Sequence, residues 1–272
     1  MLVSRCLHVT VTLVPLLPLT PAMITRDKIT EISGTDKVIL LLGYTGTGRS
    51  TFINAIGEGD RASVNKSPGC MRPCTKKIAS FRLTPLGSNE PPVVLVDTPG
   101  FGNDTDFVTF ATIHDWLLTH TSIETVSIFW FCQIGSNRRT NSEGETWKSF
   151  KSACGEEAMK ASVTVVTTGW GGPGGTRHAE REQQLKTEFL TGCTFERLPI
   201  DTDSTFSASA CRIIDNAVPG SRLLIQKEFI DEGKPLDETT HGQHEERRKP
   251  PPPSKGIMSG IRKAFEFLGR KS

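Results

Sequence analysis

The sequence predicts an α/β fold in three layers, in which helices cover both faces of a mostly parallel sheet. Short apolar runs rich in β-branched residues predict four buried strands, at 37–42, 92–97, 126–132 and 161–168. Segments with helical spacing lie between these runs, and strands that alternate with helices form parallel sheets. A glycine-rich stretch follows the first strand. Because ligands of such sheets bind at the carboxyl ends of the strands, we expect the functional residues there.

The remaining elements follow from local patterns along the chain. A helix is expected over 50–56, directly after the glycine-rich stretch, and a more exposed strand over 78–83. Apolar side chains at helical spacing predict the next helix, namely Phe107, Phe110, Ile113 and Leu117, with Thr105 or Asp106 as its cap. Further helices are expected at 146–154, 179–190, 207–217 and 222–231.

Length and composition divide the chain into four parts. The 272 residues are compatible with one large domain and two tails. We expect a disordered leader, apolar and then polar, at 1–35, the α/β domain at 36–242, a charged and proline-rich linker at 243–256 and a basic amphipathic helix at 257–272. The net charge of +2 shows no excess of the kind that nucleic-acid-binding proteins carry, so we expect no nucleic-acid partner.

Both tails have alternative interpretations. Residues 7–19 are apolar and follow Arg5, which is also the pattern of a secretory signal peptide, although the run is shorter than the roughly 20 residues of a membrane span. We favour a cytoplasmic protein. The second tail has an apolar helical stripe surrounded by Lys and Arg, formed by Ile257, Ile261, Ala264, Phe265 and Leu268. That pattern predicts contact with an anionic membrane surface through 257–269, and docking on the domain is the alternative.

The seven cysteines are irregularly spaced and odd in number, which predicts free thiols in a reducing compartment. Cys70 and Cys74 are close enough in sequence to share a metal, but no second Cys or His pair at ligand spacing accompanies them. We therefore expect no metal at these cysteines.

Residues 43–50 carry the first chemical motif. Gly43-Tyr-Thr-Gly-Thr-Gly-Arg-Ser50 fits the phosphate-binding pattern G-x-x-x-x-G-K-S/T at every position but one. Glycines let the backbone wrap phosphates, and the amides of the following helix point at the anion. The exception is Arg49, which keeps the charge of the usual lysine but is longer, planar and forked. The residues predicted to bind the phosphates are Gly43, Thr45, Gly46, Thr47, Gly48, Arg49, Ser50 and Thr51.

Asp97-Thr-Pro-Gly100 ends a buried strand and supplies the second motif. We expect Asp97 to help hold Mg²⁺ and the Gly100 amide to meet a γ-phosphate. Between the two motifs, Thr75 is placed to close on the metal and the γ-phosphate, with Ser63 or Ser67 as alternatives. The predicted catalytic set is therefore Thr75, Asp97 and Gly100, and the predicted metal ligands are Ser50, Thr75 and Asp97.

Three stretches carry a family resemblance: LLGYTGTGRSTFINAI (41–56), VVLVDTPGF (93–101) and VTVVTTGW (163–170). They resemble the translation-factor class of P-loop GTPases, and within it the septin-like branch that includes the immunity-associated and chloroplast-import GTPases. SNRRTNSEGETWKSFKSACG and LLIQKEFIDEGKPLDETTHG are similar to downstream stretches of a large group of fungal G-domain proteins. The resemblance spans 36–242. It implies a Ras-like G domain of the P-loop NTPase fold that binds GTP or GDP with Mg²⁺, and a homodimer through the nucleotide face.

The chain departs from this family at three positions. The first is Arg49. The second is the base-recognition loop, where Gly171 stands near the place of an expected acid, and Thr168 and Trp170 are the residues left to face the base. The third is Phe101, which stands where Ras-like proteins have the glutamine that orients the attacking water. Hydrolysis is therefore expected to be slow without a partner or a second protomer.

The sequence leaves three functions open. The leading interpretation is a GTP-binding switch or slow GTPase, a hydrolase that uses in-line attack of water. The alternative is a pseudo-GTPase that serves as an interaction module, which Arg49, Phe101 and Gly171 favour. The third is a P-loop kinase or ATPase. The DTPG motif argues against it, and Arg138 and Arg139, the paired arginines of the domain, have no other mark of a phosphate-covering lid.

Overall fold

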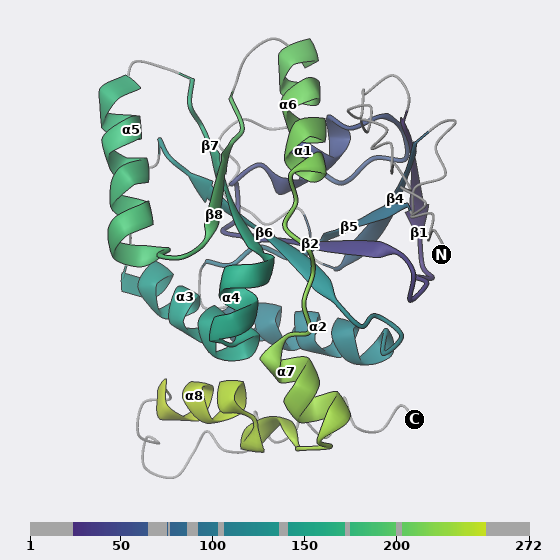
Figure 1. Cartoon of the computed structure of the whole chain (residues 1–272), viewed down its shortest axis with the longest axis vertical. Helices are drawn as coiled ribbons and strands as arrows, with labels where there is room; N and C mark the ends of the chain where they lie inside the picture. The colour runs from purple at the N-terminus through teal and green to yellow at the C-terminus, as the bar shows by residue number, and fades with distance from the viewer. Residues whose placement is uncertain are drawn as a thin grey trace, which may run out of the picture.

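The computed structural model of the chain describes residues 24–64, 75, 77–85, 92–102, 106–135, 141–171, 175–199 and 203–248. Within these residues the centre is a sheet of eight strands in the order β3-β1-β4-β5-β2-β6-β7-β8 (Figure 1). The strands are β1 Ile24–Ile29, β2 Lys37–Gly43, β3 Glu58–Gly59, β4 Ala79–Pro85, β5 Val93–Asp97, β6 Val126–Gln133, β7 Val163–Thr168 and β8 Thr194–Arg197.

Most of the sheet is parallel. Strands β5, β2, β6, β7 and β8 run in one direction, and β4 is antiparallel to both of its neighbours, β5 and β1. The register pairs Leu41 with Asp97 and Gly43 with Phe131, so the carboxyl ends of the three central strands lie side by side. The buried strands predicted from the apolar runs are confirmed as β2, β5, β6 and β7, and the predicted fold class is confirmed with them.

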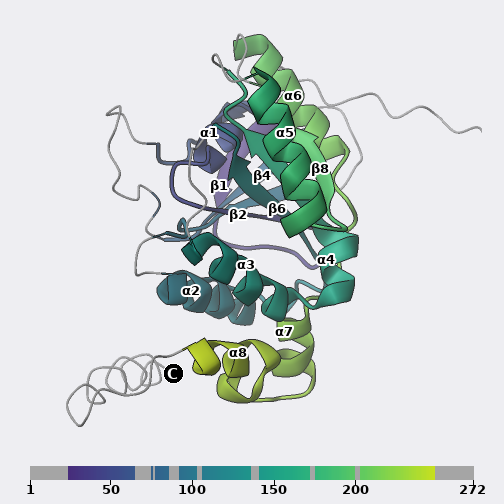
Figure 2. The same cartoon turned by 90° about the vertical axis from the view of Figure 1, so that its left-hand side faces the viewer.

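Helices cover both faces of this sheet (Figure 1). α1 and α6 pack on one face, and α2, α3, α4 and the helical segment η2, which follows α5, pack on the other. Figure 2 shows α7 and α8 lying beyond α2 and α3, where they add an outer helical layer. The helical segments are α1 Arg49–Asn54, α2 Asp106–Thr119, α3 Asn141–Cys154, α4 Glu156–Ser162, α5 Gly175–Gln184, α6 Asp203–Asp215, α7 Leu224–Gln226 and α8 Thr240–Arg248, with the turns η2 Leu185–Phe189, η3 Lys227–Asp231 and η4 Leu236–Glu238.

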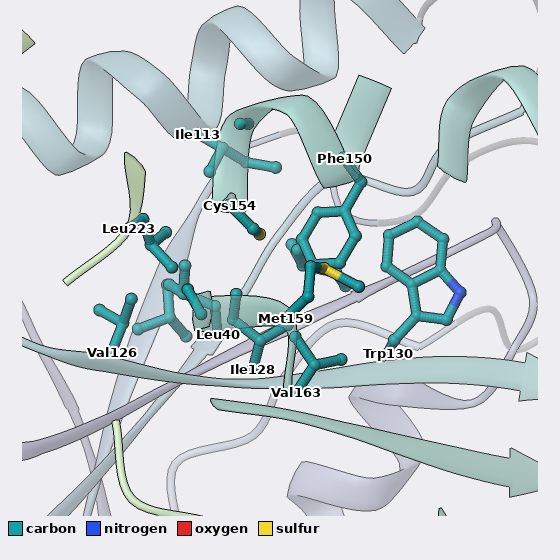
Figure 3. Close-up of a cluster of buried hydrophobic side chains, with 14 of the residues drawn as sticks. Leu40, Ile113, Val126, Ile128, Trp130, Phe150, Cys154, Met159, Val163 and Leu223 are labelled. Carbon is teal, nitrogen blue, oxygen red and sulfur yellow. The ribbon is translucent and has the colours of Figure 1, made fainter. Parts of the chain in front are cut away.

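Alternation along β2 sends neighbouring side chains into two apolar clusters on opposite faces of the sheet. Ile39 packs with residues of α1 and α6, whereas Leu40 packs with residues of α2, α3 and α4. Figure 3 shows the second cluster, in which Leu40 lies with Phe150 of α3 and Met159 of α4. Burial of one such side chain stabilises the fold by roughly 1.5–3 kcal/mol. Packing on both faces therefore fixes the strand ends from which the motif loops start.

Several boundaries differ from those expected. The leader expected to be disordered over 1–35 contains β1, which pairs antiparallel with β4. The sequence of β1, ITRDKI, carries three charged residues, which is typical of an exposed segment. The linker expected at 243–256 begins as helix, because α8 extends to Arg248. No pattern predicts α4, which delays the start of β7 from 161 to Val163. The short strands β3 and β8 have no sequence signal either.

Arg26 explains how such a polar strand stays on the sheet. The residue is 1% exposed, and its Nη1 donates to the carbonyl oxygens of Ile53 at 3.0 Å and Ile56 at 2.5 Å. Further hydrogen bonds reach the carbonyl oxygens of Gly57 and Gly59. The carbonyls of Ile53, Ile56 and Gly57 lie at or just beyond the C-terminal end of α1, where carbonyl groups run short of helical donors, and that of Gly59 belongs to β3. Burial lowers the pKa of Arg26.

The described residues leave out both ends of the chain. Residues 1–23 and 249–272, with the apolar leader and the amphipathic tail, lie outside them, as do Cys6, Cys70 and Cys74. Within the described ranges, no helix has the length and apolar character needed to cross a membrane. Cys132, Cys154, Cys193 and Cys211 form no disulfide within the described ranges.

Candidate functional site

The glycine-rich motif forms the loop from the end of β2 to the start of α1. Gly43, Gly46 and Gly48 have positive φ angles of 146°, 85° and 96°, which a residue with a Cβ adopts only under strain. A Cβ on Gly43 would stand 2.6 Å from the carbonyl oxygen of Phe131. A Cβ on Gly46 or Gly48 would meet no atom within 4 Å. The loop is therefore tight against β6 on one side and open at Gly46 and Gly48.

Internal hydrogen bonds fix the loop in this shape. The Thr45 N–H donates to the carbonyl oxygen of Phe101 at 2.9 Å, and the Thr47 hydroxyl donates to that of Tyr44 at 2.8 Å. The Thr168 hydroxyl at the end of β7 donates to the Thr47 carbonyl at 3.0 Å. Thr45 and Thr47, which we expected to bind phosphates, thus use these donors within the protein. The predicted Thr51 is an exposed residue of α1.

Arg49 points to the second motif and is 7% exposed. Its Nη1 donates to the carbonyl oxygens of Thr98 at 2.9 Å and Pro99 at 3.1 Å, and to the Thr98 hydroxyl at 3.2 Å. Gly100 is needed here because a Cβ would stand 2.7 Å from Arg49 Nη2. Burial lowers the pKa of Arg49, while the nearby carboxylate of Asp97 acts in the opposite direction. We expected Arg49 on a phosphate, and the structure places it on the DTPG backbone.

The three predicted metal ligands come together at the carboxyl end of β5. Asp97 Oδ2 accepts hydrogen bonds from Ser50 Oγ at 2.9 Å and from Thr75 Oγ1 at 3.1 Å, and the two hydroxyl oxygens are 3.4 Å apart. Of the alternatives to Thr75, Ser63 is exposed and Ser67 lies outside the described residues.

This cluster fits a hard divalent cation. Asp97 is 1% exposed, and its Oδ1 has no hydrogen-bond partner within the described part of the chain. Burial raises the pKa of Asp97, against the opposing effects of Arg49, Ser50 and Thr75. A buried carboxylate oxygen without a partner is costly, and a cation such as Mg²⁺ satisfies it through oxygen ligands. Ser50, Thr75 and Asp97 are the oxygen donors available for it.

The segment expected to recognise the base is held by a network that the sequence does not reveal. Trp170 Nε1 donates to the carbonyl and hydroxyl oxygens of Thr167, both at 3.1 Å. The Arg197 guanidinium lies 4.2 Å from the centre of the Trp170 ring and forms a 2.6 Å ion pair with Glu182. Burial alone would raise the pKa of Glu182, but hydrogen bonds from Arg197, Lys186 and Thr167 lower it. Trp170 therefore has its N–H and one ring face already engaged.

Phe101 lies in the core and not in the site. Its side chain is fully buried, with the ring 4.8 Å from that of Phe110 and 5.6 Å from that of Trp130, centre to centre. Its backbone bonds to Gly43 and Thr45 join the DTPG segment to the glycine-rich loop. A side chain in this position cannot orient a water molecule, which agrees with the missing glutamine at this point of the sequence.

Part of the chain is similar to a known protein family. Residues 38–163, less than half of the chain, match the family described as 50S ribosome-binding GTPase. No protein of curated function matches the chain significantly.

Solved structures similar to this chain include three GTP-binding or translocon proteins. One is Toc33 from Arabidopsis thaliana, a dimerization-deficient mutant, with a TM-score of 0.47 and 13% identity. The match covers 69% of this chain and 88% of that chain. A second, described as the chloroplast translocon components atToc33 and psToc159, has a TM-score of 0.50 and 13% identity. The match covers 70% of this chain and 87% of that chain. A third, a nucleolar GTP-binding protein 1 from Plasmodium falciparum, has a TM-score of 0.41 and 14% identity. The match covers 69% of this chain and 91% of that chain.

The sheet order, the glycine-rich loop and the family match define the class. The described residues form a three-layer α/β domain of the P-loop GTPase fold. At 13% identity, the neighbour with a TM-score of 0.50 supports the fold alone.

Proposed function

We propose that this protein binds GTP and GDP with Mg²⁺ and acts as a nucleotide-dependent switch or slow GTPase. The observation that carries the proposal is the cluster of Ser50, Thr75 and Asp97, in which Asp97 Oδ1 has no partner among the described residues. The match of residues 38–163 to a GTPase family gives independent support. Mg²⁺, when bound, would neutralise negative charge on the phosphates.

The residues of the chain have separate tasks in this proposal. Gly46 and Gly48 present open backbone to the phosphates, and the amides at the start of α1 face the same anion. Ser50, Thr75 and Asp97 hold the cation. Arg49 reaches a phosphate only after it leaves the carbonyl oxygens of Thr98 and Pro99. Phosphate binding would thereby release the DTPG segment, and this exchange is the switch that we propose.

Hydrolysis by this site is slow in our proposal because Phe101 is buried in the core. One structural neighbour carries a description in which dimerization is important for its GTPase activity. We propose that this chain likewise forms a homodimer through the nucleotide face, and that the second protomer supplies the group that orients water. Turnover per protomer that rises with protein concentration would support the dimer, and constant turnover would contradict it.

A pseudo-GTPase that acts as an interaction module is the second candidate. The engagement of Arg49 with Thr98 and Pro99 favours it, since the charge meant for phosphate is already satisfied. Gly171 also stands near the position where an acidic residue would hydrogen-bond to guanine, and Trp170 beside it has no carboxylate to replace that residue.

Fluorescent GTP and ATP titrations of the full chain, with and without Mg²⁺, separate these candidates. We expect binding that depends on Mg²⁺ and favours GTP, and that Ser50→Ala weakens at least about tenfold. Thr112→Ala, a change at a partly exposed position on α2 away from the site, is the matched control. If the folded chain binds neither nucleotide, the pseudo-GTPase is correct. A pseudo-GTPase that binds nucleotide constitutively would bind GTP without hydrolysing it in single-turnover assays. A preference for ATP would indicate an ATPase or kinase.

The tail at 257–269 remains a separate proposal. We propose that it binds an anionic membrane surface from the cytoplasm, supported by the apolar stripe and surrounding basic residues of its sequence. Co-sedimentation with anionic vesicles should require residues beyond Pro250. Equal sedimentation of the full and truncated chains would contradict the proposal.

A further inference from the structure

A pocket of about 160 Å³ lies beside the glycine-rich loop and apart from the cation cluster. Its walls come from that loop, the end of β6, α3 and the α5–η2 helix, and include Thr45, Thr47, Trp130, Trp147, Arg181 and Leu185. Ser50, Asp97 and Arg49 are not among the lining residues. The pocket is therefore distinct from the place proposed for the phosphates and Mg²⁺.

Part of the pocket wall is apolar. Trp130 is 2% exposed, Leu185 5% and Leu190 1%, and all three line the pocket. A cavity of about 150 Å³ in a protein core is large enough to bind benzene. The pocket therefore has room for an apolar group of about the size of a single ring.

Trp147 supplies a polar group without a partner. The residue is 6% exposed, and its Nε1 has no hydrogen-bond partner within the described ranges. Burying an N–H donor without an acceptor costs stability, so such a donor calls for explanation. Because an indole N–H only donates, the missing partner must be a hydrogen-bond acceptor.

Arg181 indicates that this acceptor belongs to an anion. It lines the same pocket from α5 and forms no ion pair with any residue that the structure describes. The described lining contains no Asp or Glu, so the pocket does not suit a cation. A guanidinium binds a planar carboxylate through two parallel hydrogen bonds, which suits an anion with an apolar body.

We propose that this pocket binds a small amphipathic carboxylate. The apolar, ring-sized body packs on Trp130, Leu185 and Leu190, and the carboxylate accepts hydrogen bonds from Arg181. The Trp147 ring turns on binding so that its buried Nε1 donates to the same carboxylate. The site requires no nucleotide and no Mg²⁺.

Phenylacetate is the probe, and the indole N–H resonances of the ¹⁵N-labelled full chain are the readout, recorded without nucleotide. Trp147→Phe identifies the Trp147 signal. We expect phenylacetate to shift this signal in a saturable way, and the neutral phenylacetamide to bind at least about tenfold more weakly. Arg181→Gln should weaken phenylacetate binding by about tenfold, whereas Arg177→Gln, an exposed change on the same helix, should leave it unaltered.

Two results would overturn the proposal. One is a Trp147 signal that stays in place up to about 20 mM phenylacetate, well above the millimolar affinities of weak ligands. The other is equal binding of the acid and the amide, or equal binding by the Arg181→Gln and Arg177→Gln variants. Because Arg181 is a partly exposed helical residue, these comparisons stand even if Trp147→Phe fails to fold. Neither result depends on whether the protein binds GTP.

Discussion

Arg49 Nη1 donates to the carbonyl oxygen of Thr98 at 2.9 Å, so the charged residue of the glycine-rich loop is bound to the motif that follows β5. The forked guanidinium makes this possible, because the same nitrogen also reaches the Thr98 hydroxyl and the Pro99 carbonyl. A lysine ammonium is a point charge and would be free to turn toward a phosphate. Arg49 therefore links the two motifs in the absence of ligand.

Arg49→Lys is expected to separate nucleotide affinity from stability. Loss of the buried hydrogen bonds to Thr98 and Pro99 should lower the free energy of unfolding by about 1–3 kcal/mol. The same loss frees the positive charge, and GTP affinity should rise by roughly fivefold to tenfold. Urea unfolding and fluorescent GTP titration measure the two effects. Unchanged affinity in the lysine variant would show that Arg49 is no obstacle to the phosphates.

Arg49 and Asp97 show which features of the candidate site the sequence predicts and which it does not. The apolar runs predict β2 and β5 as strands of one mostly parallel sheet, with their motifs at its carboxyl ends. The structure pairs these two strands directly, which brings Ser50 to Asp97. The direction of the Arg49 side chain depends on carbonyl groups of a distant loop, and no local pattern encodes it. The same holds for Arg26 and Glu182, whose hydrogen-bond partners come from other elements.

Asp97 predicts a pH dependence of stability that Mg²⁺ reverses. Burial raises the pKa of Asp97 above its ordinary value of 3.8. The native protein then keeps a proton that the unfolded chain has already released, so the free energy of unfolding falls as pH rises from about 3.8 to the folded-state pKa. Mg²⁺ with nucleotide binds the ionised carboxylate, and its stabilising effect should grow over the same interval. Thermal unfolding across this pH range, with and without Mg²⁺ and GTP, measures both slopes.

Asp97→Asn is the control for this assignment. The amide has no charge to desolvate, so this part of the pH dependence should disappear and the Mg²⁺-dependent stabilisation with it. Ser50 and Thr75 stay in place in this variant. A falling slope that survives the substitution would contradict the assignment to Asp97. The buried His114 and His241 act in the opposite direction, because burial lowers their pKa values and makes the free energy of unfolding rise with pH.

Phe101→Gln tests whether the missing glutamine alone explains slow hydrolysis. Because the Phe101 ring packs on Phe110 and Trp130, a glutamine side chain would be buried without partners. We expect a loss of about 3–5 kcal/mol in the free energy of unfolding and no gain in single-turnover GTP hydrolysis. Phe101→Leu should cost less, since it keeps an apolar side chain. Faster hydrolysis by the glutamine variant would mean that this position can turn toward the nucleotide.

Arg26→Met is expected to weaken the attachment of β1 and the end of α1 together. The substitution keeps the apolar stem but removes the Arg26 hydrogen bonds to the carbonyl oxygens of Ile53 and Ile56, at a cost of about 2–3 kcal/mol. Because α1 follows the glycine-rich loop directly, hydrogen exchange should quicken at the α1 amides and at β1. Lys28→Met, an exposed change on the same strand, is the matched control and should leave the melting temperature nearly unchanged. Equal melting temperatures of the two variants would mean that the Arg26 hydrogen bonds add nothing to the attachment of β1 beyond the backbone pairing with β4.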